Sequence, residues 1–112
     1  METPIQLDFA ETTIKETLEW AKKMNIHLVK IEPVVPFVLT DKEMYLWLFM
    51  DTDDRITEYE QSGTIEQIKK HISENLAEHG YQNDYLEKVF FRIDSHQNVV
   101  ENYEGSYFYR LR

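Results

Sequence analysis

Two segments of the chain repeat apolar residues at three- or four-residue intervals, the spacing typical of a helix that buries one face. The first is expected over about residues 9–24, with a possible start near Asp8 or Thr13, and its predicted stripe is Ile14, Leu18, Ala21 and Met24. The second is expected over about residues 65–79, with Ile65, Ile68, Ile72 and Leu76 on its stripe. Thr64 and Gln67 have the spacing of a capping box at its start, and Gly80 provides a left-handed stop.

Seven consecutive apolar residues, Met44–Met50, form the longest apolar run of the chain. Because this run shows no alternation of apolar and polar residues, we expect a central strand that is covered on both faces. The β-favouring residues 26–32 precede Pro33 and Pro36, so a strand there lies at an edge of the sheet or breaks in two. We expect the strand to resume at residues 37–39 and to turn at residues 40–43.

The last third of the chain predicts a meander of short strands. Val89, Phe91 and Ile93 alternate with more polar residues, which indicates a half-buried strand, and residues 99–103 and 107–112 are expected to follow as return strands. Residues 55–61 fit either a short strand or an ordered loop. The predicted fold is one α+β domain over residues 1–112, with a single antiparallel sheet of about five to six strands and the two helices packed on one face.

The charge of the chain narrows the classes of partner. Twelve Lys and Arg against 21 Asp and Glu give a formal charge of −9 over 112 residues, which repels nucleic acids and anionic membranes and favours encounters with a basic protein. Solubility alone is an alternative explanation of this charge, and it requires no partner. The sequence has no cysteine, and its longest apolar run is too short to cross a bilayer, so we expect a cytoplasmic protein.

The densest group of carboxylates follows the central strand. Metal binding would need the spacing of a calcium loop, but Ile56 occupies the position of the glycine and Ser62 that of the final glutamate. We therefore predict a surface that binds a basic partner, with Tyr59 as an aromatic anchor. Its residues are Asp51, Asp53, Asp54, Glu58, Tyr59 and Glu60.

No catalytic residue, metal site or cofactor is predicted. The four histidines form no ligand motif, and no nucleophile stands at a recognisable spacing from a base. Two alternatives remain open. One is a small-ligand-binding or enzymatic domain with a pocket between sheet and helices, using Tyr45, Trp47 and His27. The other is a structural homodimer joined through an aromatic face of the sheet.

The segments YLWLFMDTDD and VFFRIDSHQNVVENY, followed by the tail YFYRLR, resemble small acidic immunity proteins of bacterial toxin systems, in particular those of the YezG kind. The resemblance spans most of the chain as a pattern of elements. It implies a bacterial protein that binds one cognate toxin, usually a nuclease, and inhibits it by occlusion. Together with the charge, it predicts a non-enzymatic protein that neutralises a basic toxin domain.

Overall fold

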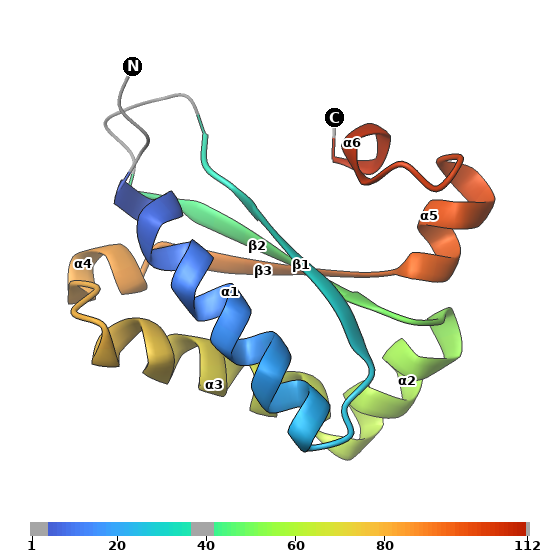
Figure 1. Cartoon of the computed structure of the whole chain (residues 1–112), viewed down its shortest axis with the longest axis horizontal. Helices are drawn as coiled ribbons and strands as arrows, with labels where there is room; N and C mark the ends of the chain where they lie inside the picture. Colours follow the sequence, from blue (N-terminus) through green and yellow to red (C-terminus); the bar gives the residue numbers. More distant parts are fainter. Residues whose placement is uncertain (1–4, 37–41, 112) are drawn as a thin grey trace.

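Three strands form one sheet in the order β1-β2-β3 in the computed structural model, which describes residues 5–36 and 42–111 (Figure 1). The strands are β1 (Leu28–Val34), β2 (Met44–Met50) and β3 (Val89–Ser95). The predictions of a central strand at Met44–Met50 and of a preceding strand at the sheet edge are confirmed, although β1 continues through Pro33 to Val34. The predicted strand at residues 37–39, and most of the predicted turn, lie outside the described residues.

Six helices accompany the sheet in the described part of the chain. They are α1 (Ile5–Lys23), α2 (Asp53–Ser62), α3 (Thr64–Glu78), α4 (Asn83–Leu86), α5 (His96–Asn102) and α6 (Tyr107–Arg110). The prediction of five to six strands with two helices is therefore wrong. Within the described ranges, no helix combines the length and the hydropathy that crossing a bilayer requires.

The prediction of a purely antiparallel sheet is also wrong. β1 pairs with β2 antiparallel, but β2 pairs with β3 parallel. A parallel neighbour needs a long crossover that returns the chain to the same end of the sheet. Residues 51–88 supply this crossover through α2, α3 and α4. Residues 55–61, expected as a short strand or an ordered loop, belong to the helix α2.

Helices also replace the last two strands of the predicted meander. The Ser95 hydroxyl accepts a hydrogen bond from the Asn98 N–H at 2.9 Å and caps α5, and Ser106 caps α6 in the same way through the Tyr109 N–H at 3.2 Å. A side-chain cap satisfies a backbone donor that would otherwise be unpaired at the start of a helix. These two caps fix helices where apolar alternation alone suggested strands.

The main core lies between one face of the sheet and the helices α1 and α3 (Figure 1). Met44, Leu46, Leu48 and Met50 of β2 are all at most 1% exposed, and they belong to the same cluster as the buried isoleucines of α3. Because alternate residues of a strand point to opposite faces, Tyr45, Trp47 and Phe49 point away from these helices.

α1 confirms the predicted stripe only in part: Ala21 is buried, and Ile14 and Leu18 pack half-buried against the core. Its fully buried positions are small residues, among them Ala10, Thr13, Thr17 and Ala21, whereas Met24 is 52% exposed. Thr13 Oγ1 donates to Asn75 Oδ1 of α3 at 2.8 Å, so the two helices share a polar contact as well as apolar ones. Asn25, in the left-handed region at φ 57°, follows the end of α1 and turns the chain toward β1.

Candidate functional site

The predicted acidic surface belongs to a helix rather than a loop. The Thr52 hydroxyl accepts the Arg55 N–H at 3.1 Å and caps α2, while Asp53 and Asp54 occupy the first turn, where carboxylates oppose the positive end of the helix dipole. Gly63, in the left-handed region at φ 81°, separates α2 from α3. Five carboxylates and one guanidinium lie between residues 51 and 62, so this part of the chain is strongly acidic.

Asp51, at the end of β2, is held by its neighbours. Its two carboxylate oxygens accept the Arg55 Nε at 3.1 Å and Nη2 at 3.2 Å, and Oδ1 also accepts the Thr52 N–H at 2.9 Å. The hydrogen bonds from Arg55, the largest cause, lower the pKa of Asp51 below its usual value. Asp51 therefore stabilises the junction between β2 and α2.

Tyr59 is part of the core. Its side chain is only 7% exposed, and its hydroxyl accepts the His27 N–H at 2.8 Å. This places the aromatic ring beneath α2, where it joins the helix to the start of β1, and leaves little of it for a partner to contact.

The other four acidic residues are exposed on α2. Asp53 accepts a hydrogen bond from the buried Ser95 hydroxyl at 2.5 Å, and Glu58 pairs with Arg55 at 3.2 Å. Asp54 and Glu60 have no hydrogen bond or ion pair among residues 5–36 and 42–111, so their carboxylates face solvent without a partner. These two residues are the ones best placed to meet a cation from outside.

A groove adjoins Glu60 between α2 and α3. It has a volume of about 310 Å³, an apolar floor from three elements and a charged rim, and its lining residues are Tyr59, Glu60, Ile65, Glu66, Lys69 and Ile93. Lys69 Nζ lies 3.4 Å from Glu66 Oε1 and 5.8 Å from the centre of the Phe91 ring. The groove therefore combines carboxylates, of which Glu60 is unpaired, with an apolar surface.

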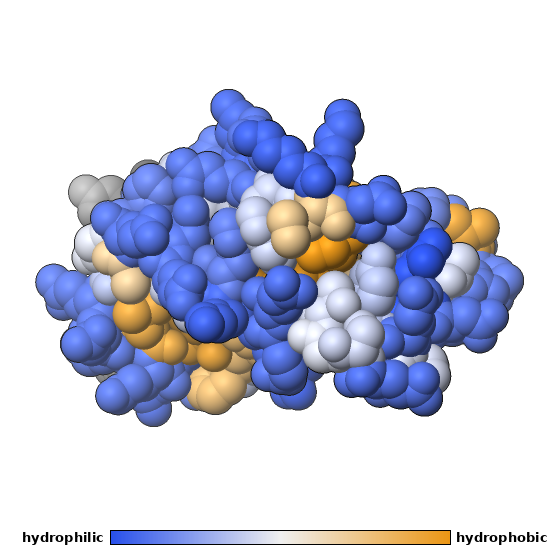
Figure 2. All heavy atoms as spheres, turned by 90° about the horizontal axis from the view of Figure 1, so that it is seen from below, coloured by the Kyte–Doolittle hydropathy of each residue, from blue (hydrophilic) through white to orange (hydrophobic). Residues whose placement is uncertain are grey.

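The sequence did not indicate this groove. Glu66 is exposed and Lys69 is half-buried on α3, but their position beside Ile93 depends on the parallel pairing of β3. Figure 2, which looks from below in Figure 1, shows a mostly hydrophilic surface with apolar atoms visible in separate places.

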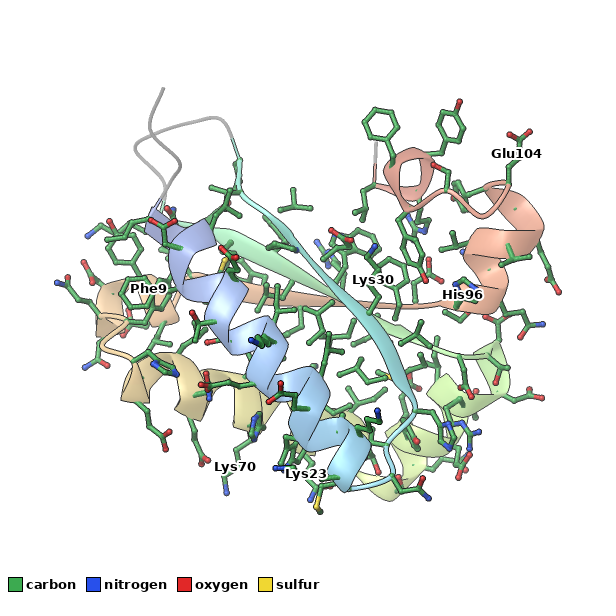
Figure 3. All side chains as sticks on the ribbon, in the orientation of Figure 1. Phe9, Lys23, Lys30, Lys70, His96 and Glu104 are labelled. Carbon is green, nitrogen blue, oxygen red and sulfur yellow. The ribbon has the colours of Figure 1, made fainter. Side chains whose placement is uncertain are left out.

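The opposite face of the sheet carries a second set of aromatic residues. α6 and the adjoining chain cover part of it: Arg110 Cζ lies 4.5 Å from the centre of the Trp47 ring, and Tyr107 packs edge-on against Phe49 at 4.7 Å. Figure 3 shows Lys30 and His96 on this side, near the C-terminal helices. A hollow of about 380 Å³ is lined there by Lys30, Glu32, Tyr107, Phe108 and Leu111.

The residues of the predicted ligand pocket do not converge between sheet and helices. Tyr45 and Trp47 point to the face that carries α6, whereas His27 lies in the exposed turn before β1, with its Nδ1 3.7 Å from Asp51 Oδ2. In the described part of the chain, no group of three or more His, Asp or Glu side chains is arranged to hold a metal ion.

Comparison with protein-family models, with curated proteins and with solved structures found no match to this chain. The resemblance to immunity proteins of the YezG kind therefore stays a prediction from the sequence.

Proposed function

We propose that this chain is a non-enzymatic protein-binding domain that takes a basic protein partner on α2 and in the groove between α2 and α3. The observation that carries the proposal is the groove itself, where the unpaired carboxylate of Glu60 stands beside an apolar floor. An arginine side chain of a partner fits this combination, because its methylene groups pack on apolar surface while its guanidinium meets carboxylates.

The charge of the chain supports the same partner. A formal charge of −9 accelerates association with a basic protein and slows it with acidic ones. The exposed Asp54 and Glu60 remain available for such a partner, whereas Asp51 and Tyr59 hold the fold around them. We propose further, from the sequence resemblance, that the partner is a toxin domain such as a nuclease and that binding blocks it by occlusion.

The experiment begins with the protein captured by this chain from its source cells and then measures binding of the purified pair by calorimetry and stopped flow. Replacing both Glu60 and Glu66 by Gln is expected to weaken binding at least tenfold, because an arginine in the groove would lose its carboxylate partners. A matched control replaces Glu11 and Glu19 by Gln on α1. It changes the net charge equally, but on two exposed positions outside the groove.

The control variant distinguishes a direct contact in the groove from the effect of the overall charge on association. If both double variants weaken binding equally, only the overall charge matters and the groove is not the site. The association rate should fall as salt is added, and a rate independent of salt would contradict the charge argument. For the toxin proposal, co-expression should restore growth of cells that produce the captured partner, and the groove variant should restore it less than the α1 variant.

A further inference from the structure

The two edges of the sheet differ in how they are protected against pairing with another strand. β1 carries Pro33, which has no N–H to donate, and its register shifts at a bulge between Leu28 and Lys30. β3 pairs with β2 in regular register over all seven residues and contains no proline. Prolines and bulges are two of the means by which proteins block an edge, and β1 has both whereas β3 has neither.

The direction of the free backbone groups on β3 follows from one hydrogen bond. The Met44 N–H donates to the Lys88 carbonyl at 2.9 Å, so this carbonyl points toward β2. Backbone groups alternate in direction along a strand, and the N–H and C=O of Val89, Phe91 and Ile93 therefore point away from β2. In the described part of the chain, no turn, cap or side chain takes up these outward groups.

We propose that two copies of this chain pair through their β3 edges, antiparallel about a two-fold axis at Phe91, to form one sheet of six strands. This register makes Phe91 face Phe91 of the partner subunit, and Val89 face the partner's Ile93. The backbone N–H and C=O groups of Val89, Phe91 and Ile93 all point outward, toward the second copy. Each of these residues and the residue opposite it therefore form a hydrogen-bonded pair, in which two backbone hydrogen bonds are exchanged.

The side chains agree with this register on both faces. On the face of α6, the exposed Arg92 and the 39% exposed Phe90 become opposite each other across the axis. Arg92 already lies 5.5 Å from its own Tyr45 ring, so it would be enclosed between two aromatic rings. On the face of α3, the half-buried Val89, Phe91 and Ile93 extend the core across the axis.

Neighbouring registers are less favourable. An axis at Arg92 would place two guanidinium groups directly opposite each other, and an axis at Phe90 would place Arg92 opposite the partner's Lys88. Like charges directly opposite across a strand pair are destabilising. The axis at Phe91 places no like charges directly opposite each other, because Lys88 then lies opposite the partner's Asp94, a carboxylate that is already paired with Arg110 in its own chain. A second copy is therefore a better occupant of the edge than an unrelated strand.

The unmodified protein gives the first test. Light scattering over a concentration series should approach twice the chain mass of 13.5 kDa, and a monomer at the highest concentration would overturn the proposal. Amide exchange should show that the Phe91 and Ile93 amides become protected as the concentration rises. The Phe90 and Arg92 amides point toward β2 and should be protected at every concentration. Outward amides that exchange equally fast throughout would refute the pairing.

Single cysteines test the register, because the chain has none of its own. In a hydrogen-bonded antiparallel pair the two Cα atoms lie about 5.5 Å apart, within the range that a disulfide spans. Phe91→Cys should therefore cross-link under mild oxidation, while Phe90→Cys and Arg92→Cys should cross-link no faster than Ser73→Cys on the exposed face of α3. Preferential cross-linking at Phe90 or Arg92 would overturn the Phe91 axis. These readouts do not use the basic partner, so they fail or succeed separately from the proposed function.

Discussion

Arg110 is expected to hold the C-terminal helices on the sheet, and replacing it by Ala tests this directly. Its guanidinium donates to the Asp94 carboxylate, whose side chain is only 11% exposed, and stacks 4.5 Å from the centre of the Trp47 ring. In Arg110→Ala, Asp94 would keep two hydrogen bonds from Asn98, at 3.0 and 3.1 Å, and one from the Ser95 N–H at 2.8 Å. The carboxylate would thus lose its charged partner without becoming wholly unpaired.

The expected magnitude follows from these contacts. A hydrogen bond to a charged group contributes about 1.5–3 kcal/mol, and the stacked cation adds about 0.5–1 kcal/mol. We therefore expect Arg110→Ala to lower the free energy of unfolding by about 2–4 kcal/mol. Arg110→Lys keeps the charge but loses the planar group that stacks on Trp47, and it should lose roughly half as much.

Urea unfolding measures the effect with two probes. Circular dichroism follows all helices, and tryptophan fluorescence in a Trp20→Phe background reports Trp47 alone, since the chain has two tryptophans. A fluorescence transition that precedes the loss of helix would show that residues 96–111 detach before the remainder unfolds. An Arg110→Ala variant within about 0.5 kcal/mol of the parent, the usual range for an unimportant surface change, would refute this account.

Three further predictions concern single contacts. Glu16 accepts hydrogen bonds from His79 and Asn75, and these bonds lower the pKa of its carboxyl. Compared with the Glu16→Gln variant, the parent should therefore be more stable above about pH 4.5, the ordinary pKa of the group, and this difference should vanish as the pH falls through the lowered pKa. Acid titration of both unfolding curves measures this, and a constant difference would contradict it. Burial raises the pKa of Tyr81 to about 12, and its buried hydroxyl has no partner among the described residues. Tyr81→Phe should therefore be at least as stable as the parent at pH 7 and lose less stability between pH 10 and 12, where the parent loses roughly 2–3 kcal/mol; equal alkaline unfolding curves would exclude this. Thr52→Ala should cost about 1 kcal/mol by removing the cap of α2, whereas the exposed Thr57→Ala should cost much less, and equal thermal shifts would count against the cap.

Local patterns predicted the elements whose own residues decide them. α3 has an apolar stripe at helical spacing and ends near Gly80, and β2 is too continuously apolar to lie anywhere but the centre of a sheet. The helices α2, α5 and α6 were not predicted because short apolar spacings there fit a strand as well as a helix. Thr52, Ser95 and Ser106 decide between the two by capping, which depends on where the preceding strand or turn stops.

The candidate site was predicted only in part for the same reason. The exposed carboxylates of α2 are visible in the sequence, but the groove beside Glu60 exists because β3 lies parallel to β2 and brings Ile93 against α2 and α3. Strand direction is set by the length and structure of the crossover, which the sequence pattern did not reveal. Tyr59 was likewise predicted to lie at the surface, because its burial depends on α2 being a helix with one side against the core.

The parallel pairing of β2 with β3 also sets an order of folding. Closing the chain between β1 and β2 spans residues 35–43 and costs about 2 kcal/mol in loop entropy, whereas bringing β3 to β2 spans residues 51–88 and costs about 3 kcal/mol. We expect β1 and β2 to associate first. During synthesis the apolar face of β2 then stays uncovered until α3 and β3 have left the ribosome. In this interval the chain is most prone to aggregate and to bind chaperones.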